Sequence, residues 1–337
     1  MKTIFVVDDN DVNLLSAENA LSDYYRVFTL PSAQSMFEFL EQIKPNLILL
    51  DIEMPGMNGF EALQKLKSDS RFADISVIFL TSRKDTTAEV RGFELGAVDF
   101  IHKPFTKPVM LRRINNQLEL EAVINEQTSE LKALRNSTVA ALARVVENRD
   151  HFTGGHIERT TMFLEILLKA MKEREVYSDI INDWDLDAVV LASRLHDVGK
   201  VTISDLILNK PGKLSKEEFE DMKKHTVEGE RIVEEIINES GSQGLLQHAK
   251  LFAGYHHERF DGTGYPHGKK GGNIPLQGRL MAIVDVYDAL ISARPYKQPF
   301  SHDKALDIVS ESMGTHFDPN IARVFLEVSD LFAEVGT

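Results

Sequence analysis

Short apolar runs alternate with amphipathic stretches over the first 118 residues of the chain. Four such runs, each bounded by polar residues, are typical of buried strands: Ile4–Val7, Leu47–Leu50, Val77–Leu80 and Val98–Ile101. Because helical stretches separate the runs, the pattern predicts an α/β domain whose doubly wound parallel sheet is covered by helices on both faces. Functional groups collect at the carboxyl ends of the strands in such sheets.

A long helix is predicted next, because residues 111–147 contain neither Gly nor Pro. Positions in alternating steps of three and four form a narrow stripe that polar members interrupt: Gln117, Leu120, Ile124, Gln127, Leu131, Leu134, Thr138, Ala141 and Val145. The stripe favours a coiled-coil signalling helix through which the chain forms a homodimer. A helix that lies on its own domain is the alternative.

The chain after residue 150 has a helical pattern, with turns at Pro211-Gly212, at Gly241 and at 261–266. This pattern predicts a second, mostly α domain. A length of 337 residues also suits two domains better than one. We therefore predict a first domain at 1–120, a coiled-coil linker at 121–137 and a second domain at 138–337.

Composition narrows the classes of partner. The net charge of −14 argues against DNA and anionic membranes as partners, although cations held in one cleft would still admit a small anionic ligand. No run of about 18 apolar residues occurs, so we expect no membrane insertion. The absence of Cys excludes disulfides and thiolate metal sites, and it indicates a reducing, cytoplasmic location.

Acidic residues follow two of the predicted strands in the first domain. Asp8 and Asp9 come directly after Ile4–Val7, and Asp51 comes directly after Leu47–Leu50. Carboxylates that converge at strand ends form a hard-oxygen site suited to Mg²⁺, which would assist transfer of a phosphoryl group onto a carboxylate. Thr81 and Lys103, after later strands, could bind the phosphoryl oxygens.

Together, in this order, these residues closely resemble the receiver domain of two-component response regulators, which has a flavodoxin-like fold. The resemblance covers residues 1 to 120 and implies a sensor histidine kinase as partner. It also implies these roles: Asp51 as phosphoacceptor, Asp8 and Asp9 as Mg²⁺ ligands, Glu53 as a backbone carbonyl ligand, Thr81 and Phe100 as a coupled switch pair, and Lys103 as the phosphate-contacting cation. In that family the Lys103–Pro104 bond is cis.

Histidines and aspartates form the strongest chemical signal of the second half. His196-Asp197 follows an apolar helical stretch, His225 comes later, His256 and His257 are adjacent, and Asp285 follows them. Neutral imidazoles with a few carboxylates and no thiolates suit Fe, Mn, Ni or Zn. Two metals that share a bridging carboxylate would hold a phosphodiester and generate hydroxide to attack it.

These residues resemble the HD-GYP family of cyclic di-GMP phosphodiesterases, from about residue 138 to 320. The resemblance rests on five segments: His196-Asp197-Val198-Gly199-Lys200, residues 210–214, Met222 to Gly229, residues 256–266 with Gly264-Tyr265-Pro266, and residues 285–297. It implies hydrolysis of cyclic di-GMP to pGpG, leaves further cleavage to GMP open, and implies a metal-dependent, all-α hydrolase domain.

The resemblance also implies the roles of single residues. His196, Asp197 and Asp285 would hold one divalent metal, and Asp197, His225, His256 and His257 the other, with Fe or Mn ahead of Ni or Zn. Asp197 and Lys200 would be catalytic, because Lys200 lies one helical turn after Asp197 and would bind phosphate or protonate the leaving oxygen. Substrate contacts are expected from Gly264, Tyr265, Asp288, Arg294 and Lys297.

One position departs from the family. Some members carry a Glu that helps to hold a third metal where this chain has Phe152, so we predict a binuclear centre. His156 is then either a retained ligand or a donor that faces phosphate, and His151 is a conceivable substitute ligand.

Two other functions stay open at this point. The second domain could be a signalling scaffold or nucleotide sensor without turnover, but the complete set of ligands together with Lys200 favours an enzyme. The substrate could be another cyclic dinucleotide, such as cyclic GMP-AMP. In either case, phosphorylation of Asp51 is expected to bias the dimer through the linker helix.

Overall fold

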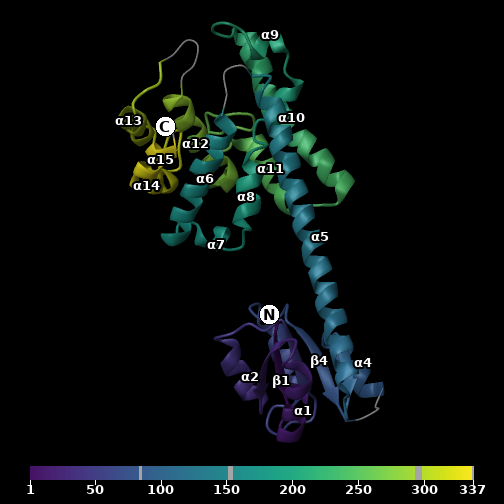
Figure 1. Ribbon diagram of the computed structural model, residues 1–337. Coiled ribbons are helices and arrows are strands. Elements are labelled where there is room, and N and C mark those ends of the chain that lie inside the picture. The colour runs from purple at the N-terminus through teal and green to yellow at the C-terminus, as the bar shows by residue number, and fades with distance from the viewer. Residues whose placement is uncertain (83–85, 151–154, 293–297, 336–337) are drawn as a thin grey trace. The chain divides into compact units, whose positions relative to one another are not determined.

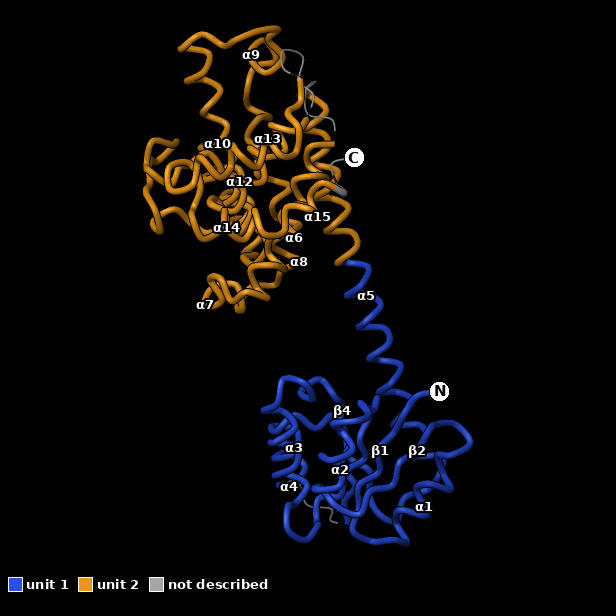
Figure 2. Tube along the Cα trace, turned by 90° about the vertical axis from the view of Figure 1, so that its left-hand side faces the viewer, with its two compact units in different colours: residues 1–131 blue, residues 132–337 orange. Residues whose placement is uncertain are grey.

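The computed structural model describes residues 1–82, 86–150, 155–292 and 298–335, and the chain divides into two compact units, Met1–Leu131 and Lys132–Thr337 (Figure 2). Within these described ranges, no helix has both the length and the apolar character needed to cross a bilayer.

The first unit contains a parallel sheet (Figure 1). Its strand order is β2-β1-β3-β4-β5. Its strands are β1 Thr3–Val7, β2 Arg26–Leu30, β3 Leu47–Asp51, β4 Ser76–Thr81 and β5 Asp99–His102. The four strands predicted from apolar runs are confirmed. Strand β2 was not predicted, because it lies at the edge of the sheet and only its last residue, Leu30, is buried.

Helices cover both faces of the sheet: α1 Asp11–Leu21, α2 Ala33–Leu40, α3 Gly59–Ser68 and α4 Thr86–Glu94, together with the start of α5. Successive residues of a strand point to opposite faces. Accordingly, Phe5 and Val7 of β1 belong to one hydrophobic cluster, whereas Ile4 and Val6 belong to another. The doubly wound α/β fold is therefore confirmed.

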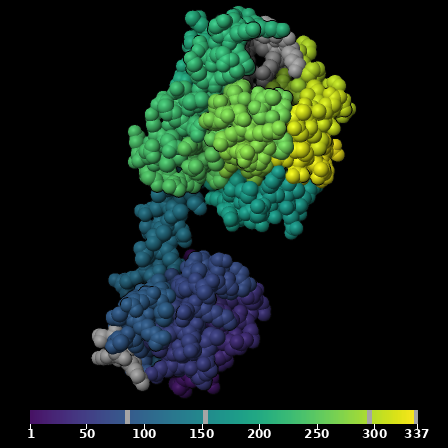
Figure 3. All heavy atoms as spheres, turned by 180° about the vertical axis from the view of Figure 1, so that it is seen from behind, coloured from purple at the N-terminus to yellow at the C-terminus, as the bar shows by residue number. Residues whose placement is uncertain are grey.

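Helix α5 (Lys107–Glu147) is 41 residues long, which confirms the predicted long helix. Its first part packs on the sheet through Met110, Ile114 and Leu118. Residues 122–138 are all exposed (Figure 3), and the stripe residues Leu131 and Leu134 are 67% and 64% exposed. The coiled-coil seam stays a prediction, but its apolar members are available to a partner.

The second unit is helical in the part that the structure describes, as predicted. Its elements are α6 His156–Glu173, α7 Ser178–Ile181, α8 Leu186–Ser193, the 3₁₀ turn η1 Val198–Thr202, α9 Asp205–Leu208, α10 Lys216–Ser240, α11 Gly244–Tyr255, the 3₁₀ turn η2 Gly271–Asn273, α12 Leu276–Ile291, α13 His302–Glu311, α14 Pro319–Glu327 and α15 Ser329–Val335. Large side chains fill its core, among them Phe163, Phe252, Tyr287 and Phe325.

Candidate functional site

The acidic site of the first unit lies at the carboxyl ends of β1 and β3. Potential ligand oxygens of Asp8, Asp9 and Asp51 lie within 4.8 Å of one another. The Lys103 ammonium lies 2.6 Å from Asp8 Oδ2 and 2.8 Å from Asp51 Oδ1. The structure thus brings together the carboxylates and the cation that were predicted to act together, and their oxygen donors fit Mg²⁺.

Burial is the main cause that raises the pKa of Asp51, and the Asp8 charge adds to it, while Lys103 opposes both. Glu53 and Thr81 line a pocket beside Asp51. Phe100 is 4% exposed, and its ring packs against Phe93 at a centroid distance of 4.9 Å. The Lys103–Pro104 bond is cis, which confirms the expectation.

Sequence reasoning did not find Asn13, whose side-chain amide donates to both oxygens of Asp8 at 3.0 and 3.1 Å. Asn13 lies on α1, five residues after Asp8. A polar residue in the first turn of a surface helix carries no sequence signal for such a contact.

A close approach of two backbone segments shapes the site of the second unit. A Cβ at Gly199 would lie 1.9 Å from the His225 carbonyl oxygen and 2.5 Å from the Gly229 amide nitrogen. Only a glycine therefore lets η1 press against α10 at this point. The close crossing places Asp197, the residue before η1, beside His225 of α10.

Six side chains form two groups there, and within each group the atoms that could bind a metal lie within 4.8 Å of one another. The first group consists of His225, His256 and His257, and the second of His156, His196 and Asp285. These residues come from α6, the α8–η1 connection, α10, α12 and the C-terminal end of α11. His156, which the sequence left undecided, therefore lies in the second group.

Asp197 lies between the two groups. Its Oδ1 lies 3.5 Å from His225 Nε2 and 3.7 Å from His256 Nε2, whereas its Oδ2 lies 3.5 Å from His196 Nε2. One carboxylate oxygen therefore faces each group. Lys200 Nζ lies 2.8 Å from Asp197 Oδ2, so the ammonium lies at the same edge of the cluster.

Burial and the neighbouring charges together set the charge states around the cluster: burial would lower the pKa of His196, but the Asp197 and Asp285 carboxylates outweigh it and raise that pKa. Burial lowers the pKa of His256 to about 3, with the neighbouring imidazoles His196 and His225 adding to the effect, and it likewise lowers the pKa of His225 and His257. Neutral imidazoles are the form that binds metals. Burial opposes the charge on Asp197, but Lys200 and His196 outweigh it and hold the pKa of that carboxyl well below its usual range.

Asp288 is buried and contacts the ring nitrogen of His156 that faces away from the cluster. Its Oδ2 is 2.7 Å from His156 Nδ1, its Oδ1 accepts from Arg159 Nε at 2.6 Å, and the residue is only 2% exposed. His156 Nε2 points to the cluster, 3.4 Å from Asp285 Oδ1 and 3.4 Å from His196 Nε2. Asp288 therefore contacts a candidate ligand, and the substrate contact expected of it stays a prediction.

The 256–266 segment forms a tight loop beside the first group. A Cβ at Gly264 would lie 2.3 Å from the Arg259 amide nitrogen, so the loop requires glycine there. The Tyr265 ring lies 4.8 Å from the His257 ring. Glu258, which sequence reasoning did not single out, is 1% exposed and its carboxylate accepts from the backbone N–H groups of His267 at 2.7 Å and Lys269 at 3.0 Å.

Several candidates fall outside the residues that the structure describes. These are Arg294 and Lys297, expected to contact substrate, and His151 and Phe152, which bear on the third metal. Among the described residues, the donor set of five imidazoles and two carboxylates fits borderline divalent metals.

Two parts of the chain each match a known protein family. Residues 4–115 match the family described as response regulator receiver domain, and residues 140–321 match the family described as HD domain. A probable cyclic di-GMP phosphodiesterase of Vibrio cholerae is 38% identical over 99% of this chain and 79% of its own length. The cyclic di-GMP phosphodiesterase response regulator RpfG of Xanthomonas campestris is 32% identical over 96% of this chain and 86% of its own length.

A further relative matches a smaller share of the chain. The 3'3'-cGAMP-specific phosphodiesterase 2 of Vibrio cholerae is 39% identical over 61% of this chain, which is 37% of that relative. The fold and the two sites define a response regulator with a receiver domain and a helical HD domain. The chain belongs to this family, whose HD domain is a metal-dependent phosphohydrolase fold.

Proposed function

We propose that this chain is an HD-GYP-type phosphodiesterase that hydrolyses cyclic di-GMP to pGpG with a binuclear metal centre. The observation that carries the proposal is the Asp197 carboxylate, whose two oxygens face two separate groups of ligand atoms. A carboxylate in this position suits a bridge between two metals. The cyclic di-GMP phosphodiesterases among the relatives support the choice of substrate.

The proposed ligands follow the two groups. Asp197 with His225, His256 and His257 would hold one divalent ion, and Asp197 with His196, His156 and Asp285 the other. His156 is thereby assigned as a ligand, because its Nδ1 is engaged by Asp288 and its Nε2 faces the cluster. Divalent ions held there supply Lewis acidity, which stabilises the charge that develops on a phosphodiester.

The protein's own groups orient the substrate. The Lys200 ammonium lies at the edge of the cluster, where it can bind a phosphate oxygen or supply a proton to the leaving ribose oxygen. Burial raises the pKa of Tyr265, and the Asp197 charge adds to this, so the phenol stays protonated and can donate a hydrogen bond. Asp288 fixes the tautomer and orientation of His156.

Product analysis tests this function. Purified, metal-loaded protein is incubated with cyclic di-GMP, and the nucleotides are resolved by chromatography. We expect pGpG, and a later rise of GMP would reveal further cleavage. Bound metal without either product would contradict the proposal and favour a sensor without turnover.

A second candidate substrate is 3'3'-cGAMP, because a relative specific for it is 39% identical over 61% of this chain. Equimolar cyclic di-GMP and 3'3'-cGAMP in one reaction give the ratio of the two kcat/KM values directly. We expect cyclic di-GMP to disappear first. Preferential loss of 3'3'-cGAMP would replace the substrate and leave the chemistry unchanged.

Regulation is assigned to the first unit. Asp51 accepts a phosphoryl group from a sensor histidine kinase, with Mg²⁺ held by Asp8 and Asp9 and the phosphate contacted by Lys103. Thr81 and Phe100 respond to the modification, and α5 carries the response. We retain the boundaries 1–120, 121–137 and 138–337 for the three parts.

The exposed stripe on α5 is proposed as the dimer seam. Replacing Leu131 and Leu134 with Lys puts charges into that seam, so a dimeric wild-type chain should become monomeric. Sedimentation velocity measures the change. Gln127→Lys and Thr138→Lys, at polar positions of the same stripe, should weaken the dimer less. A monomeric wild type, or a dimer unaffected by the Leu substitutions, would contradict the seam.

A further inference from the structure

The last turn of α5 and the residues that follow it make an unusual set of contacts with the metal site. We refer to residues 147–150 as the α5 exit turn. It is closed by hydrogen bonds from the amides of Arg149 and Asp150 to the carbonyls of Val146 and Glu147, at 3.2 and 2.9 Å. Three of its four side chains reach elements that carry site residues.

Arg149 binds the backbone that carries Lys200. Its guanidinium donates to the carbonyl oxygens of Lys200 at 3.3 Å, Val201 at 2.7 Å and Ile203 at 3.1 Å. Asn209 donates back to the Arg149 carbonyl at 2.8 Å. A planar guanidinium that holds several carbonyls at once fixes a backbone more firmly than any single hydrogen bond.

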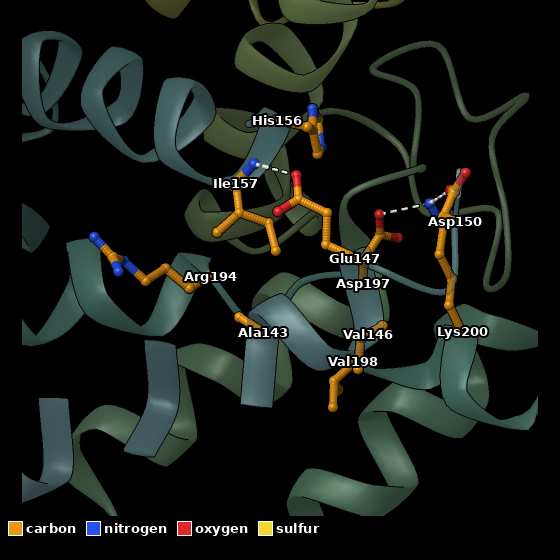
Figure 4. Close-up of a pocket in the computed structure, with 10 residues that line it drawn as sticks. All are labelled: Ala143, Val146, Glu147, Asp150, His156, Ile157, Arg194, Asp197, Val198 and Lys200. Carbon is orange, nitrogen blue, oxygen red and sulfur yellow. Dashed lines mark hydrogen bonds and ion pairs between the residues drawn. The ribbon is translucent and has the colours of Figure 1, made fainter. Parts of the chain in front are cut away.

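Asp150 binds the side chain of the same lysine. Its carboxylate is 9% exposed, and its Oδ2 lies 3.1 Å from Lys200 Nζ. On its other side, the ammonium contacts Asp197 Oδ2 at 2.8 Å. Lys200 is therefore held between the carboxylate in the bridging position and a carboxylate that belongs to the end of α5 (Figure 4).

Glu147 contacts the backbone at the start of α6, the helix that carries His156. Its Oε1 accepts from the Ile157 amide at 3.3 Å, in the first turn of α6, where the N-cap residue Gly155 has no side chain to do so. His156, the neighbour of Ile157, has its ring in the second ligand group. Figure 4 shows Glu147, Asp150, Asp197 and Lys200 around one small pocket.

We propose that the α5 exit turn positions Lys200 and the start of α6, so that a displacement of α5 is converted into a displacement of the phosphate-binding side of the metal site. The proposal rests on the function proposed above and names residues that would transmit its regulation. For such a coupling, the states of the chain with and without the phosphoryl group on Asp51 must differ in their contacts. The contacts of the Arg149 guanidinium are the ones that can be made or lost between these states. A misplacement of a catalytic group by about 1 Å can lower a rate about 100-fold.

The test uses the full-length, metal-loaded chain with and without beryllofluoride and Mg²⁺, which mimic the phosphoryl group on Asp51. Hydrogen exchange of the 198–203 amides and the kcat and KM for cyclic di-GMP are measured. In the wild type we expect beryllofluoride to change both the exchange and kcat. In Arg149→Ala we expect both responses to disappear. Asp205→Asn, which removes only the charge of the outer partner of Arg149, is the matched control and should respond as the wild type does.

Asp150→Asn tests the side-chain contact. We expect kcat to fall about 10- to 100-fold with KM changed less than about threefold, and with unchanged metal per chain. Asp150→Glu should recover part of the loss. A loss of metal in Asp150→Asn, or an unchanged kcat, would overturn the positioning role.

Two further outcomes separate this proposal from the proposed function. If the wild type does not cleave cyclic di-GMP, the substrate assignment fails, whereas the exchange of the 198–203 amides still decides the coupling. If beryllofluoride changes that exchange equally in the wild type and in Arg149→Ala, or in neither, the coupling is refuted. Arg149→Lys, which keeps the charge but cannot hold three carbonyls, replaces Arg149→Ala should the latter fail to fold.

Discussion

The two sites of this chain share one arrangement and differ in donor chemistry. In each, a lysine ammonium lies 2.8 Å from the central carboxylate, Lys103 beside Asp51 and Lys200 beside Asp197. Around Asp51 the other donors are carboxylates, whereas around Asp197 they are mostly imidazoles. The first set suits Mg²⁺ and the second suits transition metals or zinc.

The difference also concerns how the sites are built. The acids of the first unit lie at the ends of adjacent parallel strands, so the topology of the sheet alone brings Asp8 and Asp51 together. The candidate ligands of the second unit come from separate helices. Close backbone crossings, such as that of Gly199 in η1 against α10, are therefore needed to align them. We infer that the second site depends more on individual neighbours, and the substitutions below test this.

The largest contrast is expected between the two central carboxylates. Asp197→Ala removes the group that faces both ligand sets and one of the two carboxylates that contact Lys200, so we expect turnover to fall on the order of 10⁴-fold, together with metal loss. Asp51→Ala should leave metal content and basal turnover unchanged but abolish the response to beryllofluoride. Metal analysis and single-turnover kinetics on both variants measure this.

The expected difference between the two carboxylates would be contradicted if Asp51→Ala removed metal from the second unit. It would also be contradicted if Asp197→Ala kept full activity. Asp183→Ala, an exposed aspartate of the second unit, serves as the control for the loss of any one carboxylate from that unit.

A smaller effect is expected at Asp288, which contacts the candidate ligand His156. Asp288→Asn keeps the shape of the side chain but loses the charge that orients His156 through Nδ1, so metal affinity should fall about 10- to 100-fold. Competition with a chelator measures the affinity. Asp303→Asn, at an exposed position of α13, should leave it unchanged, and equal affinities in Asp288→Asn and wild type would show that Asp288 does not orient a ligand.

The sequence predicted some parts of the fold better than others, for physical reasons. Continuous apolar runs such as Leu47–Leu50 predicted the central strands, because buried parallel strands are apolar on both faces. In the edge strand Arg26–Leu30 only Leu30 is buried, and the polar Arg26 and Thr29 leave no such run.

For the candidate site too, the sequence predicted some residues and missed others. The candidate ligands could be named because the His196-Asp197 and His256-His257 pairs indicate a metal site and because the segments around them resemble the HD-GYP family. Their neighbours could not be named: Arg149 and Asp150 contact η1 about fifty positions away, and Asp288 contacts His156 more than a hundred positions away. A polar residue on a helix does not reveal its distant partner, so the sequence indicated neither the contact of Asp288 with His156 nor those of Arg149.

The smallest expected effect concerns acid stability, which should distinguish the histidine-rich second unit from the first. Burial, with the Arg259 charge, lowers the pKa of His316 to about 4, whereas an unfolded His titrates near about 6.5. The unfolded state therefore binds the proton more tightly, and the stability that this imidazole contributes is present above pH ~6.5 and is lost as the pH falls toward 4. Between pH 7 and pH 5 the loss amounts to about 2 kcal/mol.

His316→Gln should remove this component, so its free energy of unfolding should fall less than that of the wild type over the same pH interval. Trp184 is the sole tryptophan of the chain and belongs to the second unit, so urea midpoints followed by its fluorescence report that unit alone. Both proteins are compared after treatment with a chelator, because bound metal would shift the midpoints. His102→Gln in the first unit should leave the pH dependence as in the wild type. Equal losses in the wild type and in His316→Gln would mean that His316 titrates alike in the folded and unfolded chains, and the acid sensitivity of the second unit would then have to come from its other histidines.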